Sequence, residues 1–267
     1  YYKIRGAYKS TMKDNQGAIS DFNKVIGMNP DEPNIYIDKA IEEIKVGHFD
    51  EAMKGFTTAL SVDPNSARAY VRRGEAKHKL VDYAGALDDV NEAIKIDPEY
   101  ADAYVERGLI RSLQKDYVQS LSDYDRAIQI EPKHLDCYLY RGILNEKLER
   151  HSDALADFTK AIEINPNVDS GYIQRARVKM QLGDQFGALE DLNKAIEIDP
   201  VKDETYLNRG RTKYIMAKNL KSSLADLSKA IEINPKSSEA YSSKALVEVL
   251  LGDQSKALED YTRAIEL

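Results

Sequence analysis

Apolar and small side chains recur along this 267-residue chain at a nearly constant interval. The interval is clearest in tyrosine, whose steps are 34 residues six times and 35 residues once. These tyrosines are Tyr2, Tyr36, Tyr70, Tyr104, Tyr138, Tyr172, Tyr206 and Tyr241. A proline follows the same interval, as Pro30, Pro64, Pro98, Pro132, Pro166, Pro200 and Pro235. A fixed interval of this length indicates an array of similar units, each stacked on its neighbours.

We number each repeat so that its tyrosine is position 4 and its proline is position 32. Positions 8 and 20 are then small, position 24 is large and apolar or aromatic, and position 27 is alanine in all repeats but the first. Spacings of four and three place such residues on one face of an α-helix. Each repeat therefore predicts two helices, A over positions 2–14 and B over positions 18–30. Helix B should end before the proline, because a residue preceding proline disfavours helical backbone angles.

The fifth repeat shows the pattern in full, with Tyr138 and Gly142, then Ala154 and Phe158, then Pro166. This order resembles the signature of the tetratricopeptide repeat family, with tyrosine where that family often has tryptophan. The resemblance implies an all-α, right-handed superhelical solenoid of about eight antiparallel helix hairpins.

We expect a single array that is a piece of a longer protein. The repeats run approximately over residues 1–32, 33–66, 67–100, 101–134, 135–168, 169–202, 203–237 and 238–267. One extra residue lies in the seventh repeat, between Gly210 and Ser223. The repeated tyrosines should be buried between helices.

A charge pattern accompanies the apolar one. Position 7 is basic in every repeat, and position 23 is aspartate in seven of the eight. Because both positions lie equally far from the turn, antiparallel helices should pair them as a ladder of Arg–Asp contacts. The second repeat departs from this, with Lys39 at position 7 and Gly55 at position 23. An exposed pair would contribute only about 0–1 kcal/mol; a charged binding stripe is the alternative interpretation.

Composition and motifs argue against a catalytic, metal-binding or nucleic-acid-binding site. The net charge is −7, which offers no basic field for nucleic acid, and we predict no nucleic-acid partner. Cys137 is the single cysteine, and the four histidines lack metal-ligand spacing. We expect no catalytic residues, no metal and no cofactor. We also expect no membrane insertion, because no apolar run approaches the ~20 residues of a membrane helix, and we expect a cytoplasmic location.

The resemblance also implies that the A helices line a concave groove that binds peptides. Positions 2, 5, 6, 9, 12 and 13 should face this groove. They carry a net charge of +3 in the first three repeats and −3 in the next two, which suggests a partner with an acidic segment and basic residues nearby. Ordinary solvated charges are the alternative interpretation. The candidate peptide-binding residues are Lys3, Asp38, Lys45, Arg68, Arg72, Lys79, Tyr140, Arg177, Asn208 and Arg211.

Two binding schemes of the family do not match these positions. Its carboxylate clamp uses two asparagines that are missing here, and Asp38 would repel a carboxylate. Its asparagine ladder at position 6 is reduced to Asn208. We therefore expect a non-enzymatic scaffold for a partner protein or peptide, with chaperone-related work or complex assembly as examples.

Two alternatives to this function stay open. The array could recruit substrates or regulate an enzyme that lies outside this sequence. It could also self-associate through uncapped terminal repeats, where apolar surface is expected at Ile4, Ala257, Tyr261 and Ile265.

Overall fold

The computed structural model describes residues 1–216 and 219–267, which form sixteen α-helices and no strand. The chain divides into two compact parts: an N-terminal part, Tyr1–Cys137, and a C-terminal part, Tyr138–Leu267. The helices of the N-terminal part are α1 (Tyr2–Thr11), α2 (Asn15–Met28), α3 (Pro33–Lys45), α4 (Phe49–Val62), α5 (Ala67–Lys79), α6 (Tyr83–Ile96), α7 (Ala101–Leu113) and α8 (Tyr117–Ile130).

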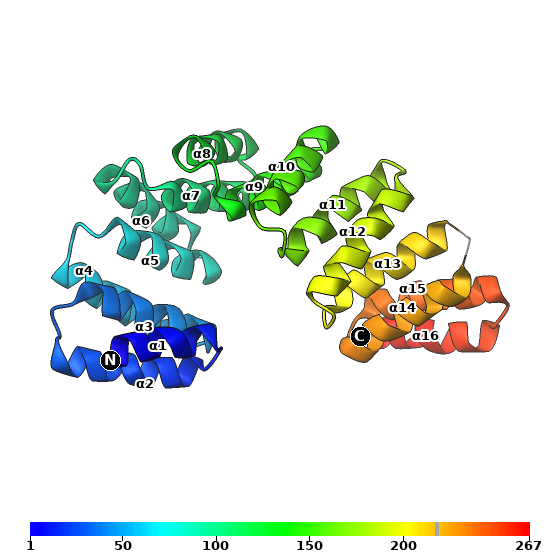
Figure 1. Ribbon diagram of the computed structural model, residues 1–267, viewed down its shortest axis with the longest axis horizontal. Coiled ribbons are helices and arrows are strands. Elements are labelled where there is room, and N and C mark those ends of the chain that lie inside the picture. The colour runs from blue at the N-terminus through cyan, green and yellow to red at the C-terminus, as the bar shows by residue number, and fades with distance from the viewer. Residues whose placement is uncertain (217–218) are drawn as a thin grey trace. The chain divides into compact units, whose positions relative to one another are not determined.

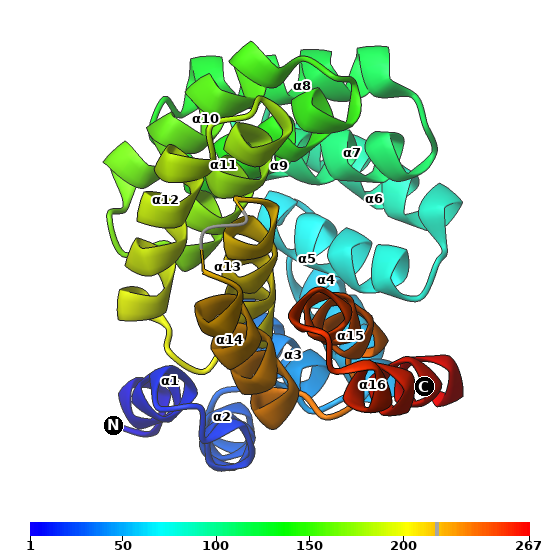
Figure 2. The same cartoon turned by 90° about the vertical axis from the view of Figure 1, so that its right-hand side faces the viewer.

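The remaining helices lie in the C-terminal part, except that α9 begins in the N-terminal one. They are α9 (Leu135–Lys147), α10 (His151–Ile164), α11 (Asp169–Gln181), α12 (Gln185–Ile198), α13 (Asp203–Ile215), α14 (Leu220–Ile233), α15 (Ser238–Leu251) and α16 (Gln254–Glu266). Odd-numbered helices are the A helices and even-numbered ones the B helices of hairpins 1 to 8. Figures 1 and 2 show the two helices of a hairpin side by side. The prediction of an all-α helical repeat fold is confirmed.

Two adjacent positions set the turn inside the hairpins other than the seventh. At position 15 of these hairpins the backbone is left-handed, both at glycines such as Gly183 (φ 80°) and at Val81 (φ 65°). At position 16 an aspartate or asparagine often caps helix B, as where the Asp82 side chain accepts from the Gly85 backbone N–H. In the seventh hairpin the link between α13 and α14 is one residue longer than usual, which agrees with the extra residue predicted there. Residues 217 and 218 of this link lie outside the described residues.

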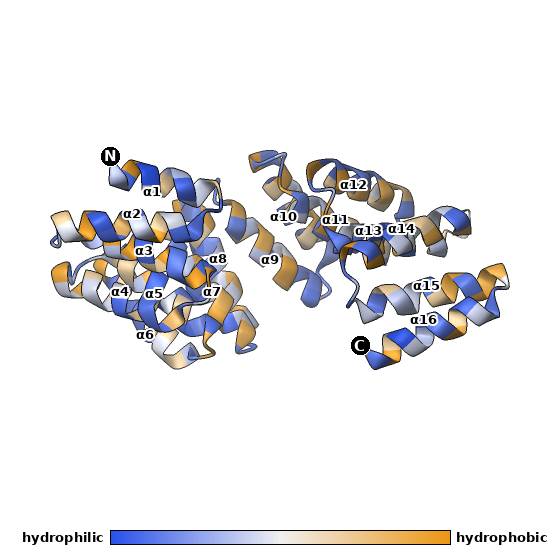
Figure 3. Ribbon diagram, turned by 90° about the horizontal axis from the view of Figure 1, so that it is seen from below, coloured by the Kyte–Doolittle hydropathy of each residue, from blue (hydrophilic) through white to orange (hydrophobic). Residues whose placement is uncertain are grey.

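Helices A and B of a hairpin approach closely because position 8 is small. A Cβ added at Gly108 would stand 2.8 Å from Cε1 of Tyr124, the residue at position 24. Position 24 is fully buried in hairpins such as the second and fifth, where it is Phe56 or Phe158. Each helix carries hydrophobic and hydrophilic residues, so the apolar faces form a core within each part (Figure 3).

The repeated tyrosines are not buried as the sequence led us to expect. Only Tyr138 is buried, at 8% exposed, and the other seven are half-buried. The phenol hydroxyl explains the difference, because it needs a hydrogen-bond partner. Tyr36, for example, donates to the carbonyl oxygen of Pro30 at 3.0 Å, and the same bond recurs at Tyr104, Tyr172 and Tyr206.

The predicted Arg–Asp ladder is present in every hairpin that has both residues. In the third hairpin Arg73 holds Asp89 through two hydrogen bonds of 2.6 and 2.8 Å. The equivalent pairs are Arg5–Asp21, Arg107–Asp123, Arg141–Asp157, Arg175–Asp191, Arg209–Asp226 and Lys244–Asp260. Most of the carboxylates are buried, Asp89 for instance at 4% exposed, so the small energy of an exposed pair does not apply to them.

A second cation that the sequence analysis missed completes the ladder. Position 11 supplies it, as where Lys77 reaches Asp89 at 2.8 Å. In the fifth hairpin position 11 is Asn145, which donates to Asp157 at 3.0 Å but carries no charge. Burial then dominates and raises the pKa of Asp157. In the first hairpin Arg5 instead holds the pKa of Asp21 below its usual value.

The second hairpin keeps an ion pair by moving the carboxylate. Lys39 at position 7 pairs with Glu43 at position 11, at 3.2 Å, where six of the other hairpins have a cation or asparagine. Gly55 fits the space opposite, since a Cβ there would lie 3.0 Å from Cβ of Ala40. The eighth hairpin has both arrangements: Lys244 contacts Glu248 at 3.0 Å and also contacts Asp260.

Candidate functional site

The A helices lie next to one another along one face of each part. In the N-terminal part α5 contacts α3 and α7, and in the C-terminal part α13 contacts α11 and α15. We call the residues at positions 2, 5, 6, 9, 12 and 13 of these helices the A-face. All ten candidate binding residues lie on it, so its contacts decide which of them are available to a partner.

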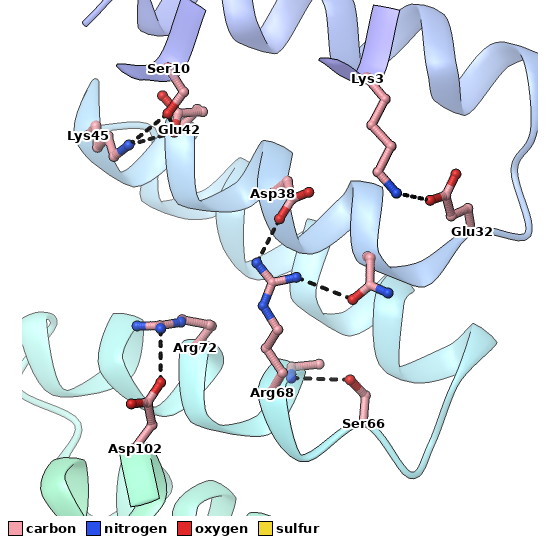
Figure 4. Close-up of polar contacts among 12 residues, drawn as sticks. Lys3, Ser10, Glu32, Asp38, Glu42, Lys45, Ser66, Arg68, Arg72 and Asp102 are labelled. Carbon is pink, nitrogen blue, oxygen red and sulfur yellow. Dashed lines mark hydrogen bonds and ion pairs between the residues drawn. The ribbon is translucent and has the colours of Figure 1, made fainter. Parts of the chain in front are cut away.

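In the first two hairpins the basic candidates are paired within the N-terminal part. Lys3 contacts Glu32 in the link before α3. Lys45 contacts Glu42 at 2.6 Å and Ser10 of α1 at 3.2 Å (Figure 4). Glu42 is only 3% exposed, and its Oε2 atom has no hydrogen-bond partner among the described residues. These carboxylates lie outside the six positions used for the charge count, so the count missed them.

Arginine side chains bridge successive A helices in the same part. Arg68 of α5 donates to Asp38 of α3 at 2.7 Å, and to Asn34 at 3.2 Å (Figure 4). Arg72 contacts Glu75 on its own helix and donates to Asp102 of α7 at 3.1 Å. Lys79, by contrast, is simply exposed. Four of the five basic candidates in this part therefore already contact carboxylates.

Two histidines extend these bridges. Nδ1 of His78 lies 2.5 Å from Glu106 of α7, and Nε2 of His134 lies 2.9 Å from Asp102. The bond to Asp102 raises the pKa of His134, and reciprocally His134 lowers the pKa of Asp102. His78 thus lies against the carboxylate of Glu106, a residue that is 6% exposed.

The A-face of the C-terminal part is less charged. Arg177 of α11 holds Glu146 of α9 through two bonds, at 2.7 and 2.5 Å, and Gln181 adds a third at 3.1 Å. Arg211 contacts Glu239 across α13 and α15. Tyr140 and Asn208 are half-buried. Position 6 is uncharged on all four A helices, as Tyr140, Gln174, Asn208 and Ser243.

A pocket of about 220 Å³ opens between α11 and α13 beside these residues. Its apolar lining comes from Ala176, Met180, Leu192 and Ile215. Three of the candidates line its polar side: Arg177, Asn208 and Arg211. The structure thus brings these three together around one hollow, where an apolar group could be buried beside hydrogen-bonding side chains.

The terminal helices expose part of the apolar surface expected of them. Ile4 is 75% and Ile265 is 86% exposed, while Tyr261 is half-buried. Ala257 was expected to be exposed and is instead buried, at 2%. It occupies position 20, where the small side chain packs inside its own hairpin.

Among the described residues, no three histidine, cysteine or carboxylate side chains come together in a way that could hold a metal ion. Nor does the same part of the chain contain a helix with the length and apolarity needed to span a membrane.

Sequence-family models of the tetratricopeptide repeat match residues 37–101, 135–168 and 170–202. The chain belongs to the tetratricopeptide repeat family. Helical-repeat arrays of this kind generally act as interaction scaffolds with extended binding surfaces. No curated protein sequence matches this chain.

Solved structures agree with the fold. A tetratricopeptide repeat protein from Parabacteroides merdae is 18% identical, with a TM-score of 0.63 and coverage of 96% of this chain and 97% of that one. A chain of the APC/C hetero-tetramer Cut9–Hcn1 is 12% identical, with a TM-score of 0.76. The match covers 98% of the present chain and 52% of that one. YrrB, described as having an unusual peptide-binding site, is 24% identical with a TM-score of 0.55, covering 70% of this chain and 96% of that one.

Proposed function

We propose that this tetratricopeptide array is a non-enzymatic scaffold that binds a segment of a partner protein on the A-face of its C-terminal part. The observation that supports this most directly is the pocket between α11 and α13, where Arg177, Asn208 and Arg211 surround an apolar hollow. Most of the basic candidates in the N-terminal part, and Arg177 and Arg211 in the C-terminal part, are engaged with carboxylates, so an acidic partner would have to displace those contacts in either part. An apolar group entering the pocket would not. The proposal includes a cytoplasmic location and no cofactor.

A random peptide library displayed on phage would test the proposal, with selected peptides titrated against purified variants. We expect Asn208→Arg to weaken binding about tenfold or more, because a long charged side chain would occupy the rim of the pocket. Gln129→Arg, on an exposed position of α8, is the matched control and should bind normally. Failure to select any peptide, or equal binding by Asn208→Arg, would contradict the proposal.

Arg68→Gln separates this site from the one that the sequence favoured. Glutamine removes the charge that would attract an acidic segment and keeps a hydrogen-bond donor. We expect selected peptides to bind this variant as they bind the original protein. Loss of binding would instead move the site to the N-terminal part.

Self-association is a second candidate function, supported by the exposure of Ile4 on α1 and Ile265 on α16. Isolated apolar residues are common on protein surfaces, which makes this the weaker candidate. Light scattering over a range of protein concentrations tests it. A mass that stays at the 30.1 kDa of one chain would exclude it.

A further inference from the structure

The pocket between α11 and α13 extends inward to position 24 of hairpin 6, where the side chain is Leu192. Position 24 carries an aromatic ring in five hairpins and an aliphatic side chain in three. The rings are Phe22, Phe56, Tyr124, Phe158 and Tyr261, and the aliphatic residues are Val90, Leu192 and Leu227. Leu192 is 1% exposed, so it closes the pocket at its inner end. The pocket lies between two inner hairpins, since α10 packs on α11 and α15 packs on α14.

In hairpin 2 a ring fills the equivalent place. Phe56 shares a buried cluster with Ala40, at position 8, and with Ala76, at position 10 of the next hairpin. Ile44, at position 12, packs against the same cluster. The residues at these three positions around the pocket are Ala176, Thr212 and Met180. Because leucine is shorter than phenylalanine, Leu192 fills less of this space than Phe56 does.

Hairpin 3 shows how a short residue at position 24 is compensated elsewhere. Val90 shares a buried cluster with Ile110, which is at position 10 of the next hairpin and is fully buried. Thr212 at this position is smaller than isoleucine, and its hydroxyl donates to the carbonyl oxygen of Asn208 at 2.8 Å. The pocket therefore results from two small side chains of successive hairpins, Leu192 and Thr212.

The volume and the apolar lining of the pocket suit an aromatic ring. The volume is about 220 Å³, and an apolar cavity of about 150 Å³ is large enough to hold benzene. Met180 contributes a thioether, which makes favourable contacts with aromatic rings. Ile215 lines the pocket and is 53% exposed, so a bound ring would remove apolar surface from water.

Two guanidinium groups complete the lining. Among the described residues the pocket is lined by Arg177 and Arg211 and by no carboxylate. The carboxylates that pair with them lie to either side, Glu146 on α9 and Glu239 on α15. Arg211 also lines a larger pocket, of about 570 Å³, between α13 and α15. The face of an aromatic ring is partially negative, so a neutral ring complements these cations without displacing their carboxylates.

The repeat framework already contains this combination of contacts. The Arg73 guanidinium lies 5.5 Å from the ring centre of Tyr70 while it holds Asp89 through two hydrogen bonds. The equivalent arginines of hairpins 1, 4, 5, 6 and 7 lie 5.2 to 5.8 Å from their tyrosine rings. An arginine of this fold can therefore contact a ring and a carboxylate at the same time.

We propose that the pocket between α11 and α13 binds one aromatic side chain of the partner segment, with Arg177 and Arg211 against the ring and with Leu192 and Thr212 setting the depth. The inference rests on the proposed function and gives it a partner chemistry: phenylalanine, tyrosine or tryptophan, with no requirement for an acidic neighbour. The partner's ring then fills the place that Phe56 fills in hairpin 2.

Leu192→Phe is the decisive variant, because it supplies a ring from within the chain. Position 8 is alanine in hairpin 6 as in hairpin 2, so the new ring has the same neighbour as Phe56 and the variant should fold. We expect it to bind peptides selected by the original protein about tenfold or more weakly. Thr212→Ile, which follows Ile110 of hairpin 4, fills the pocket from the other side and serves if Leu192→Phe does not fold.

Leu220→Phe is the matched control. It makes the same change at position 17 of hairpin 7, where hairpin 2 has Phe49, and Leu220 does not line the pocket. This variant should bind the selected peptides normally. Weakening by both phenylalanine variants alike would point to a general disturbance of the C-terminal part and would overturn the assignment to this pocket.

The selected peptides provide the second test. Replacing their shared aromatic residue by alanine should weaken binding to the original protein about tenfold or more. Replacing it by leucine should cost about threefold, since leucine keeps apolar area but loses the contact with the arginines. Arg211→Lys keeps the charge and loses the planar group, so it should weaken the aromatic peptides more than the leucine ones. Methyl NMR gives a direct readout: peptide addition should shift the signals of Met180 and Ile215.

Three further results would overturn the inference. Peptides that share no aromatic residue, or that bind Leu192→Phe as well as the original protein, would reject the aromatic pocket. If Asn208→Arg still weakened those peptides, the proposed function would stand without it. Selection of no peptide at all would reject both. Methyl shifts of Ile215 that grow with protein concentration, without peptide, would show that a second copy of the chain occupies the pocket.

Discussion

The two parts of the molecule share one repeating framework but differ on the A-face. In the N-terminal part, position 6 is charged on α3, α5 and α7, and pairs such as Arg68–Asp38 and Arg72–Asp102 connect one A helix with the next. In the C-terminal part, Arg177–Glu146 and Arg211–Glu239 also connect A helices, but position 6 is uncharged throughout and two pockets lie on either side of α13. Packing inside the hairpins fixes positions 8, 20, 24 and 27, and it leaves the A-face positions free to differ. The face is therefore where the two parts can take different roles.

The difference also affects what a ligand must do. A partner that binds charged groups already engaged with each other must replace those contacts, and the net gain from such an exchange is small. Burying apolar surface in a pocket has no such competitor and contributes about 25 cal/mol for each Å² removed from water. We infer that the C-terminal part is the better place for binding, and the N-terminal part the better place for stabilising contacts between hairpins.

The largest predicted effect concerns the Arg–Asp ladder, which both parts share. Asp89→Ala in the N-terminal part and Asp191→Ala in the C-terminal part should each lower the free energy of unfolding by about 3 kcal/mol. Each aspartate is 4% exposed and faces an arginine and a lysine, whose charges would lose their partner. Denaturation with urea, followed by circular dichroism, measures the change.

The neighbouring exposed residues provide the controls for this pair. Asp88→Ala and Glu190→Ala remove a carboxylate from the same helices and should change stability by less than about 0.5 kcal/mol. If only one of the two aspartate variants lost much stability, the ladder would not contribute equally in the two parts. The parts would then differ in their internal packing as well as on the A-face.

The second prediction tests the difference between the A-faces of the two parts. Arg72→Ala should lower stability by about 1–2 kcal/mol, because Glu75 and Asp102 lose a partly buried partner. Arg211→Ala should cost less than about 0.5 kcal/mol, since its pair with Glu239 is exposed. The same two variants, titrated with selected peptides, should show the opposite order, with only Arg211→Ala weakening binding. Equal effects of both variants in both assays would remove the distinction between the two A-faces.

Most of the fold could be predicted from the sequence because the same positions are repeated eight times. Helix α3 covers positions 1–13 and α4 covers 17–30, within about a residue of the ranges expected for A and B. The ladder could also be found, because position 7 is basic in every repeat and position 23 is aspartate in seven of the eight. Its second cation at position 11 was missed, although Lys9, Lys77, Lys179 and Lys213 give it a visible period.

The candidate site was harder to predict for physical reasons. A count of A-face charges cannot show that Arg68 and Arg72 have partners, since ion pairs depend on side-chain directions across two helices. Pockets depend on side chains from several helices, as in the pocket that Ala176, Leu192 and Ile215 line.

A third prediction concerns the turn at position 15, where the backbone is left-handed in both parts. Lys13, Val81, Lys115 and Glu149 have positive φ angles there, and Gly47, Gly183 and Gly252 adopt the same conformation as glycines. A β-branched residue is strained in this conformation, so Val81→Gly should raise the free energy of unfolding by about 1 kcal/mol. Gly183→Val, the reverse change at the equivalent position, should lower it by about as much. Thermal unfolding of both variants checks this, and a destabilised Val81→Gly would contradict it.

The smallest predicted effect is a pH dependence confined to the N-terminal part. The bond to Asp102 raises the pKa of His134 above its unfolded value. The stabilisation is therefore complete below about pH 6.5 and is lost as the pH rises through the folded pKa. Asp102 has a lowered pKa, so its own contribution is lost only in acid, well below this window. Stability should thus fall by less than about 1 kcal/mol between about pH 6 and pH 8.

His134→Gln isolates this effect, because glutamine can donate to Asp102 but does not titrate. We expect the difference in unfolding free energy between the original protein and the variant to shrink as the pH rises. His48→Gln, an exposed position at the start of α4, should leave the pH profile unchanged. Local hydrogen exchange, corrected for its intrinsic pH dependence, should place the change in α7, which carries Asp102, and not in α11 to α16. A change spread over both parts would mean that the bridges of the N-terminal A-face do not act locally, and the contrast between the parts would lose its energetic basis.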